Sequence, residues 1–117
     1  MVLNIAMNYG SRDEIVRAVK NISTDVKSGK IDVENIDEAL FSNYLYTAGQ
    51  PDPDLIIRPS GEYRISNFML WQAAYTEFVI MNKLWLILKN RTLTRLLIYT
   101  LNATGALEEY KEQVDQL

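Results

Sequence analysis

The hydrophobic pattern opens on a predicted strand and then changes to helical spacing. Residues 2–8 are mostly apolar and predict a buried strand. Apolar residues then recur every three or four positions, as on one face of an amphipathic helix: Ile15, Val16, Val19, Ile22 and Val26. Ser11 and Glu14 have the spacing of a capping box, which would begin this helix, and Gly29 is a suitable residue to end it.

The next stretch predicts short helices and then a loop. Asp32 or Asp37 is expected to cap one or two short helices. Their shared apolar face would be formed by Ile36, Leu40, Phe41, Tyr44 and Leu45. Residues 49–54 contain two closely spaced prolines, which remove backbone donors and fix φ, so this segment is predicted to be a loop.

The remaining pattern predicts two strands separated by a loop and a helix. Residues 55–57 form a short apolar strand, residues 58–66 a loop, and residues 78–81 another strand. Residues 67–75 are apolar nearly all round, which predicts a buried helix. The alternation of strands and helices predicts an α/β fold: a mostly parallel sheet with flanking helices.

Composition and charge narrow the chemistry. The chain contains no cysteine and no histidine, so catalysis or metal binding would depend on carboxylates, Arg, Lys, Tyr or Ser. Its formal net charge of −3 argues against general nucleic-acid binding, which needs a clustered positive surface. The first residues have no basic region typical of a signal peptide. We expect a cytoplasmic protein.

The loop at residues 58–66 is a candidate anion-binding site. It follows a strand and enters a predicted helix, and ligands of α/β sheets bind outside the carboxyl ends of strands. Arg58 and Arg64 could grip phosphate oxygens, and Ser66 offers a hydroxyl. Glu77 is an oxygen ligand of the kind that Mg²⁺ shares with a diphosphate. Each residue also has a simpler interpretation. Arg58 or Arg64 would be a solvated surface charge or would form a salt bridge with Glu62, and Ser66 would be a helix N-cap.

A long motif gives these residues a specific context. Residues 58–77 read R-x-S-G-E-x-R-I-S-N-F-x-L-W-Q-x-A-Y-x-E. This segment closely resembles the diphosphate-binding region of the cis-prenyltransferases, the undecaprenyl diphosphate synthase family. Two further stretches resemble the same family: LNIAMNYGSRDEI at residues 3–15 and YLYTAGQPDPDLIIR at residues 44–58. The resemblance is continuous over residues 3–85.

The resemblance implies a reaction and a role for each site residue. Arg58, Arg64 and Ser66 would hold the diphosphate of isopentenyl diphosphate, and Glu77 would help to hold Mg²⁺. The implied activity is a transferase reaction that condenses isopentenyl diphosphate onto an allylic diphosphate and makes a lipid carrier. Family members are expected to form homodimers and to meet the membrane surface through their product.

The two ends of the sequence depart from the family. The D-G-N-G-R-W loop, whose aspartate the resemblance assigns to Mg²⁺ and the allylic diphosphate, does not occur in this sequence. We therefore expect residues 1–85 to be the C-terminal half of the domain, a truncated cis-prenyltransferase fold. This half alone would be inactive. The alternative function is a non-catalytic partner subunit that dimerises with a full-length synthase.

Residues 86–117 do not resemble the family's ending and form a separate, loosely helical tail in our interpretation. A reverse translation of this tail, read one base out of frame, begins with P-D-F and ends with R-R-F-G-G-I, as family members do. We predict that the tail is a frameshifted translation. The competing interpretation is a basic amphipathic helix that contacts a membrane.

Overall fold

The computed structural model describes residues 2–59 and 61–82, together with 94 and 98. These residues belong to two compact units. The first unit comprises residues 2–52 and 65–74, and the second comprises residues 53–64, except 60, and the described residues from 75 onward. The predicted tail, residues 86–117, lies outside the described residues apart from 94 and 98.

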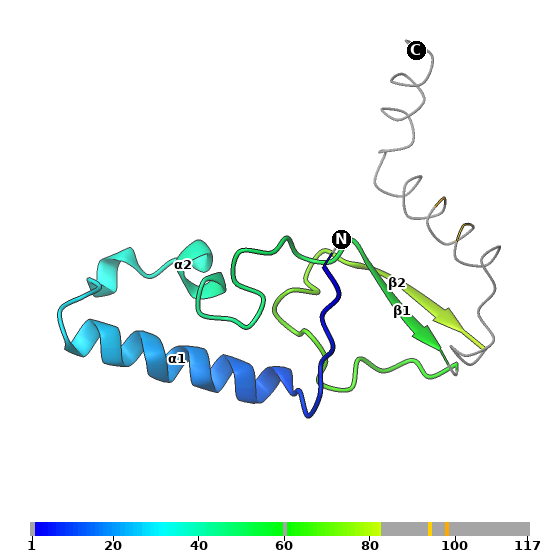
Figure 1. The fold of residues 1–117 in the computed structure, drawn as a ribbon, viewed down its shortest axis with the longest axis horizontal. Coiled ribbons are helices and arrows are strands. Elements are labelled where there is room, and N and C mark those ends of the chain that lie inside the picture. The colour runs from blue at the N-terminus through cyan, green and yellow to red at the C-terminus, as the bar shows by residue number, and fades with distance from the viewer. Residues whose placement is uncertain (1, 60, 83–93, 95–97, 99–117) are drawn as a thin grey trace, which may run out of the picture. The chain divides into compact units, whose positions relative to one another are not determined.

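Helix α1, Ser11–Lys27, is the main element of the first unit (Figure 1). It ends as predicted, because Gly29 has a φ of 74° and its amide bonds the carbonyl of Val26. The predicted capping box is wrong. Gly10 is the N-cap, and Ser11 already belongs to the helix, so its hydroxyl does not cap the first turn.

The start of α1 is instead capped by Asn67, which is distant in sequence. The backbone amide of Ser11 donates to the carbonyl of Asn67 at 2.8 Å, and the amide of Arg12 donates to Asn67 Oδ1 at 2.9 Å. In return, Ser11 Oγ accepts a hydrogen bond from the amide of Leu70 at 2.9 Å. Two of the unpaired amides of the first helical turn are thus satisfied by tertiary contacts.

The buried face of α1 differs from the predicted face. It contains Ser11, Glu14, Ala18 and Ile22, whereas Val16 and Val19 are about half exposed. The prediction selected the most apolar residues. The segments that pack on the helix determine which of its residues are buried. At the start of the helix these segments hydrogen-bond to Ser11 and Glu14, so these two polar residues are buried.

Two aspartates cap the short elements that follow, as predicted. The 3₁₀ helix η1, Val33–Asn35, begins after Asp32, whose carboxylate accepts from the amide of Glu34. Helix α2, Glu38–Ser42, begins after Asp37, whose carboxylate accepts from the amide of Leu40 at 2.7 Å. Leu45 is buried just beyond α2. The prolines at 51 and 53 lie in an irregular segment, which confirms the predicted loop.

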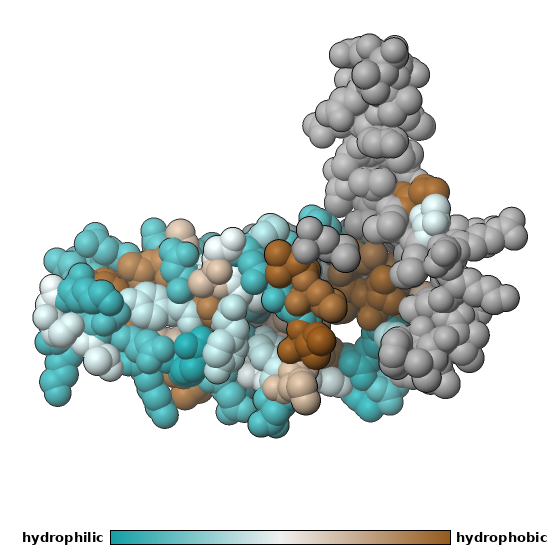
Figure 2. Space-filling view, viewed as in Figure 1, coloured by the Kyte–Doolittle hydropathy of each residue, from teal (hydrophilic) through white to brown (hydrophobic). Residues whose placement is uncertain are grey.

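The predicted strand at residues 2–8 is wrong: the segment belongs to no sheet of the described chain. A strand needs a hydrogen-bonded neighbour, and the described residues provide none for this segment. Its apolar side chains remain at the surface, with Leu3 79%, Ile5 76% and Met7 84% exposed. Figure 2 shows such brown, apolar side chains uncovered along the N-terminal segment.

The predicted helix at residues 67–75 is also wrong. The segment forms consecutive turns, and Ser66, Asn67 and Met69 have positive φ angles of 52°, 60° and 49°. A right-handed helix requires negative φ at every residue. Within this segment only Gln72 and Ala73 are buried. An apolar helix is stabilised mainly by packing of its side chains against other elements, and most side chains of this segment are not buried.

The second unit contains a pair of parallel strands. Strand β1, Leu55–Pro59, pairs with β2, Glu77–Met81, in a register that places Leu55 beside Glu77 and Arg58 beside Ile80 (Figure 1). Both predicted strands and their parallel direction are confirmed. The described chain is therefore α/β, as predicted. Within the described residues, no helix combines the length and the apolar character needed to cross a membrane.

Candidate anion-binding site

Two arginines of the second unit converge on one carboxylate. Arg58 Nη2 lies 2.5 Å from Glu62 Oε2, and Arg64 Nη2 lies 2.7 Å from Glu62 Oε1. Each oxygen of the carboxylate thus accepts from a different guanidinium group. The arginines are already arranged around an anion that offers two acceptor oxygens, a feature that a phosphate group shares with a carboxylate.

The strand and the following loop build this arrangement. Arg58 lies within β1, where the ladder fixes its backbone, and its side chain is 25% exposed. Gly61 then turns the chain back with a φ of 71°, and its amide bonds the carbonyl of Met81 at the end of β2. A Cβ atom at residue 61 would collide with the side chain of Asn82. Only glycine fits at this turn, and the turn leads directly into Glu62, which contacts Arg58.

The electrostatics of Glu62 follow from its two partners. The hydrogen bond from Arg58 is the main cause that lowers the pKa of the Glu62 carboxyl, and the positive charge of Arg64 adds to it. The carboxylate is therefore ionised at neutral pH. The cluster holds two positive charges and one negative charge, so it retains an attraction for anions.

Glu77 is placed away from this cluster. It opens β2 beside Leu55, three residues before Arg58 along the strand pair, which corresponds to a separation of roughly 10 Å. Side chains alternate between the two faces of a sheet, so residues three positions apart project from opposite faces. Glu77 and Arg58 therefore do not share a ligand atom in this arrangement. The described residues contain no group of three or more carboxylates that could hold a metal ion.

Ser66 belongs to the first unit and is exposed. The predicted helix after Ser66 does not form in the described chain, so Ser66 does not lie at a helix N-terminus. The structure thus brings Arg58 and Arg64 together around Glu62. A contribution from Ser66 remains a prediction from the resemblance.

The first unit contains a buried carboxylate that the sequence pattern did not indicate as a polar site. Glu14 is 1% exposed and accepts hydrogen bonds from the hydroxyl of Tyr9 at 2.5 Å and the backbone amide of Tyr46 at 2.6 Å. The side-chain amide of Gln72 donates to it at 3.4 Å and to Thr47 at 3.1 Å. Burial, followed by the hydrogen bond to Glu14, raises the pKa of the Tyr9 hydroxyl. The sequence signal for this burial was the position of Glu14, a charged residue on the face of the helix that is otherwise apolar.

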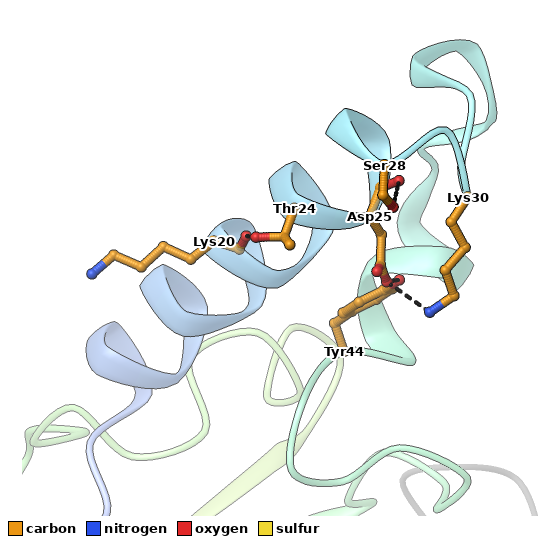
Figure 3. A network of polar contacts seen from close by, with 6 residues as sticks. All are labelled: Lys20, Thr24, Asp25, Ser28, Lys30 and Tyr44. Atoms are coloured by element: carbon orange, nitrogen blue, oxygen red, sulfur yellow. Dashed lines mark hydrogen bonds and ion pairs between the residues drawn. The ribbon is translucent and has the colours of Figure 1, made fainter.

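A second polar cluster secures the end of α1 (Figure 3). Asp25 lies between Tyr44 and Lys30, accepting from the Tyr44 hydroxyl and from Lys30 Nζ at 3.1 Å. The hydrogen bond from Tyr44, followed by that from Lys30, lowers the pKa of the Asp25 carboxyl. The same contact raises the pKa of Tyr44. These residues connect the helix to the segment after α2, and we assign them a structural role.

Comparison with known proteins identifies the family. The family model described as "Putative undecaprenyl diphosphate synthase" matches residues 1–103. Isoprenyl transferases from Clostridium tetani and Bacillus subtilis are 61% and 58% identical to the chain, each over 85 residues or 73% of its length. The chain belongs to the undecaprenyl diphosphate synthase family, the cis-prenyltransferases. It spans about a third of the length of these relatives, 33% in both cases.

Two solved structures agree with the fold. A lavandulyl diphosphate synthase from Lavandula x intermedia, in complex with dimethylallyl diphosphate, is 40% identical with a TM-score of 0.76, covering 81% of this chain and 41% of its own. A probable undecaprenyl diphosphate synthase from Campylobacter jejuni is 33% identical with a TM-score of 0.68, covering 83% and 42%. The described α/β arrangement is thus part of a cis-prenyltransferase fold.

Proposed function

We propose that this chain carries the half-site that binds the diphosphate of isopentenyl diphosphate in a cis-polyprenyl diphosphate synthase. The observation that carries this function is the convergence of Arg58 and Arg64 on the two oxygens of one carboxylate. Membership of the family supports the choice of ligand. Ser66 is included on the resemblance alone.

In the proposed reaction, the residues of this chain bind and orient one reactant. The allylic diphosphate loses its diphosphate group, the double bond of isopentenyl diphosphate attacks the allylic carbon, and loss of a proton leaves a cis double bond. Arg58 and Arg64 would fix the isopentenyl diphosphate and neutralise its charge, which lowers the entropic and electrostatic cost of the encounter. The polyprenyl product would bring the protein from the cytoplasm to the membrane surface.

The described residues do not fit a complete Mg²⁺ site. Mg²⁺ needs near-octahedral oxygen coordination, and the described residues place Glu77 in no group of three or more carboxylates that could hold the ion. We therefore assign no step to Mg²⁺ on these residues. A role for Glu77 as one of several metal ligands remains part of the proposal that rests on the resemblance.

Titration calorimetry with inorganic pyrophosphate tests the half-site. The charge-removing double variant Arg58→Gln with Arg64→Gln should weaken binding at least about tenfold, because hydrogen bonds to charged groups are worth about 1.5–3 kcal/mol each. A matched variant, Arg12→Gln with Lys20→Gln, removes the same charge from α1 and should bind as the wild type does. Equal weakening in both variants would show a general charge effect and refute the site. Titrations with and without Mg²⁺ would show whether the metal contributes.

A second assay addresses turnover. Because the D-G-N-G-R-W loop is absent from this sequence, we expect the chain alone to make little or no polyprenyl product from labelled isopentenyl diphosphate and an allylic primer. Clear elongation by the purified chain would overturn this expectation.

The exposed apolar segment favours a second function, that of a partner subunit. Leu3, Ile5 and Met7 are each more than 75% exposed, at 79%, 76% and 84%, an arrangement typical of a surface that another chain covers. Copurification with a full-length isoprenyl transferase would support this function. Loss of that copurification on changing Ile5 to Asp, with binding of pyrophosphate unaffected, would locate the contact.

A further inference from the structure

Glu62 occupies the space that an anionic ligand of the two arginines would need. Its carboxylate spans the gap between the guanidinium groups, with one oxygen on Arg58 and the other on Arg64. Both contacts are short, at 2.5 and 2.7 Å. A phosphate oxygen that bonded the same two donors would have to take the positions now held by the Glu62 oxygens.

The carboxylate does not use the full donor capacity of Arg58. Its Nη2 donates to Glu62, but its Nε is buried and has no hydrogen-bond partner among the described residues. A phosphate group commonly binds a guanidinium through two parallel hydrogen bonds. An incoming phosphate could therefore satisfy a donor that Glu62 leaves unpaired, and this gain favours exchange.

Glu62 is also able to leave. Its side chain is 39% exposed, in contrast to the buried Glu14, and a released carboxylate would be hydrated by solvent. Arg64 is 67% exposed and free to follow a ligand of a different shape. The contacts of Glu62 are thus partly exposed ion pairs, a kind of contact that contributes little to folding and is readily exchanged.

We propose that Glu62 is an internal counter-ion that occupies the arginine pair in the absence of substrate and that the diphosphate of the substrate displaces. This role rests on the proposed function. It makes Glu62 a brake on anion binding, because any ligand of the two arginines must displace a carboxylate already in place. A diphosphate carries more charge and more acceptor oxygens than a single phosphate, so it binds the more tightly of the two after the same cost of displacing Glu62.

The variant Glu62→Gln tests this role by removing the negative charge at nearly constant shape. Its amide oxygen accepts from one arginine, but its amide nitrogen cannot accept from the other. We expect calorimetry to show pyrophosphate binding about tenfold tighter than in the wild type, a change equal to 1.4 kcal/mol. Binding of single inorganic phosphate should tighten by the same factor, because both ligands must displace the same carboxylate.

The variant Glu34→Gln is the control for net charge, since it removes one exposed carboxylate from η1. It should leave both affinities at the wild-type values. If Glu34→Gln binds pyrophosphate as tightly as Glu62→Gln does, Glu62 is not a competitor, and the tighter binding is a long-range effect of net charge. Thermal melting monitored by circular dichroism should show that both variants remain folded.

Failure of this role differs from failure of the proposed function. If the wild type binds pyrophosphate through Arg58 and Arg64 but Glu62→Gln binds it equally or more weakly, Glu62 positions the arginines and is not a competitor. If no variant binds pyrophosphate, the half-site itself is refuted and the role of Glu62 with it.

Discussion

Two glutamates, one in each unit, show how the same group is used differently. Glu14 is almost completely buried and accepts from a hydroxyl, a backbone amide and a side-chain amide, all of them neutral. Glu62 is partly exposed and accepts from two charged guanidinium groups. Neutral donors fixed by the fold hold Glu14 in place, whereas charged donors on a solvated surface hold Glu62 in a way that another anion can replace.

A similar difference separates the buried contacts of the first unit from the arginine cluster of the second. In the first unit, several polar contacts connect distant segments, as when Asn67 caps α1 and Glu14 bonds Tyr46. In the second unit, the charged contacts join residues within seven positions, Arg58 to Arg64, on one strand and its loop. Long-range buried contacts stabilise a fold, and short-range exposed contacts leave charges available to a ligand. The four predictions below test this contrast.

The largest expected effect comes from removing the buried carboxylate. Changing Glu14 to Ala should lower the free energy of unfolding by about 3 kcal/mol, because buried donors lose a charged acceptor and a cavity forms. Urea denaturation followed by circular dichroism measures this change. The companion variant Glu62→Ala should have a much smaller effect on stability. Comparable losses in the two variants would contradict the contrast between the units.

Loss of the long-range cap should be the next largest effect. Changing Asn67 to Ala should destabilise the chain by about 1–2 kcal/mol, since the amide of Arg12 loses its acceptor and alanine tolerates a φ of 60° poorly. Asn67→Asp keeps the acceptor and places a negative charge at the helix start, so it should remain near wild-type stability. The same denaturation experiment compares them. An unaffected Asn67→Ala would mean that the cap contributes nothing.

The two arginines should differ in their tolerance of lysine. Arg58 is the more buried, at 25% exposed and with its backbone in β1, whereas Arg64 is 67% exposed. Arg58→Lys should weaken pyrophosphate binding about fivefold or more, because lysine cannot form two parallel hydrogen bonds. Arg64→Lys should weaken it less. Calorimetry on both variants would detect the reverse order, which would place the main contact on Arg64.

The smallest effect is a dependence of stability on pH at the end of α1. Tyr44 lowers the pKa of Asp25, so the stability from this carboxylate is present above its unfolded pKa of about 3.9 and is lost as the pH falls through the lower folded value. Asp25 raises the pKa of Tyr44, so the hydroxyl stabilises below its unfolded pKa of about 10 and this contribution is lost as the pH rises through the folded value.

Tyr44→Phe should therefore have a slightly lower melting temperature than the wild type at neutral pH. The difference between the two melting curves should shrink at both extremes of pH. A constant difference from acid to alkaline pH would exclude the contact between Tyr44 and Asp25 as its cause.

Features that depend on nearest neighbours were predictable from the sequence. Asp32 and Asp37 cap the helices that follow them because the acceptor and the amide lie within three residues. Gly29 ends α1 because glycine accepts a positive φ. The apolar runs of β1 and β2 indicated strands, and the motif at residues 58–77 indicated the family and the arginines of the site.

What only the tertiary structure decided depends on contacts between distant segments. Residues 2–8 and 67–75 have the patterns of a strand and a helix, yet neither forms, because a strand needs a partner and an apolar helix needs its side chains packed against other elements. The cap of α1 comes from Asn67, not from Ser11. The register of β1 and β2 separates Glu77 from Arg58, and the turn at Gly61 brings Glu62 to both arginines. The sequence pattern indicates the local structural preference of each segment. It does not give the distances between residues of different segments, which depend on the tertiary structure.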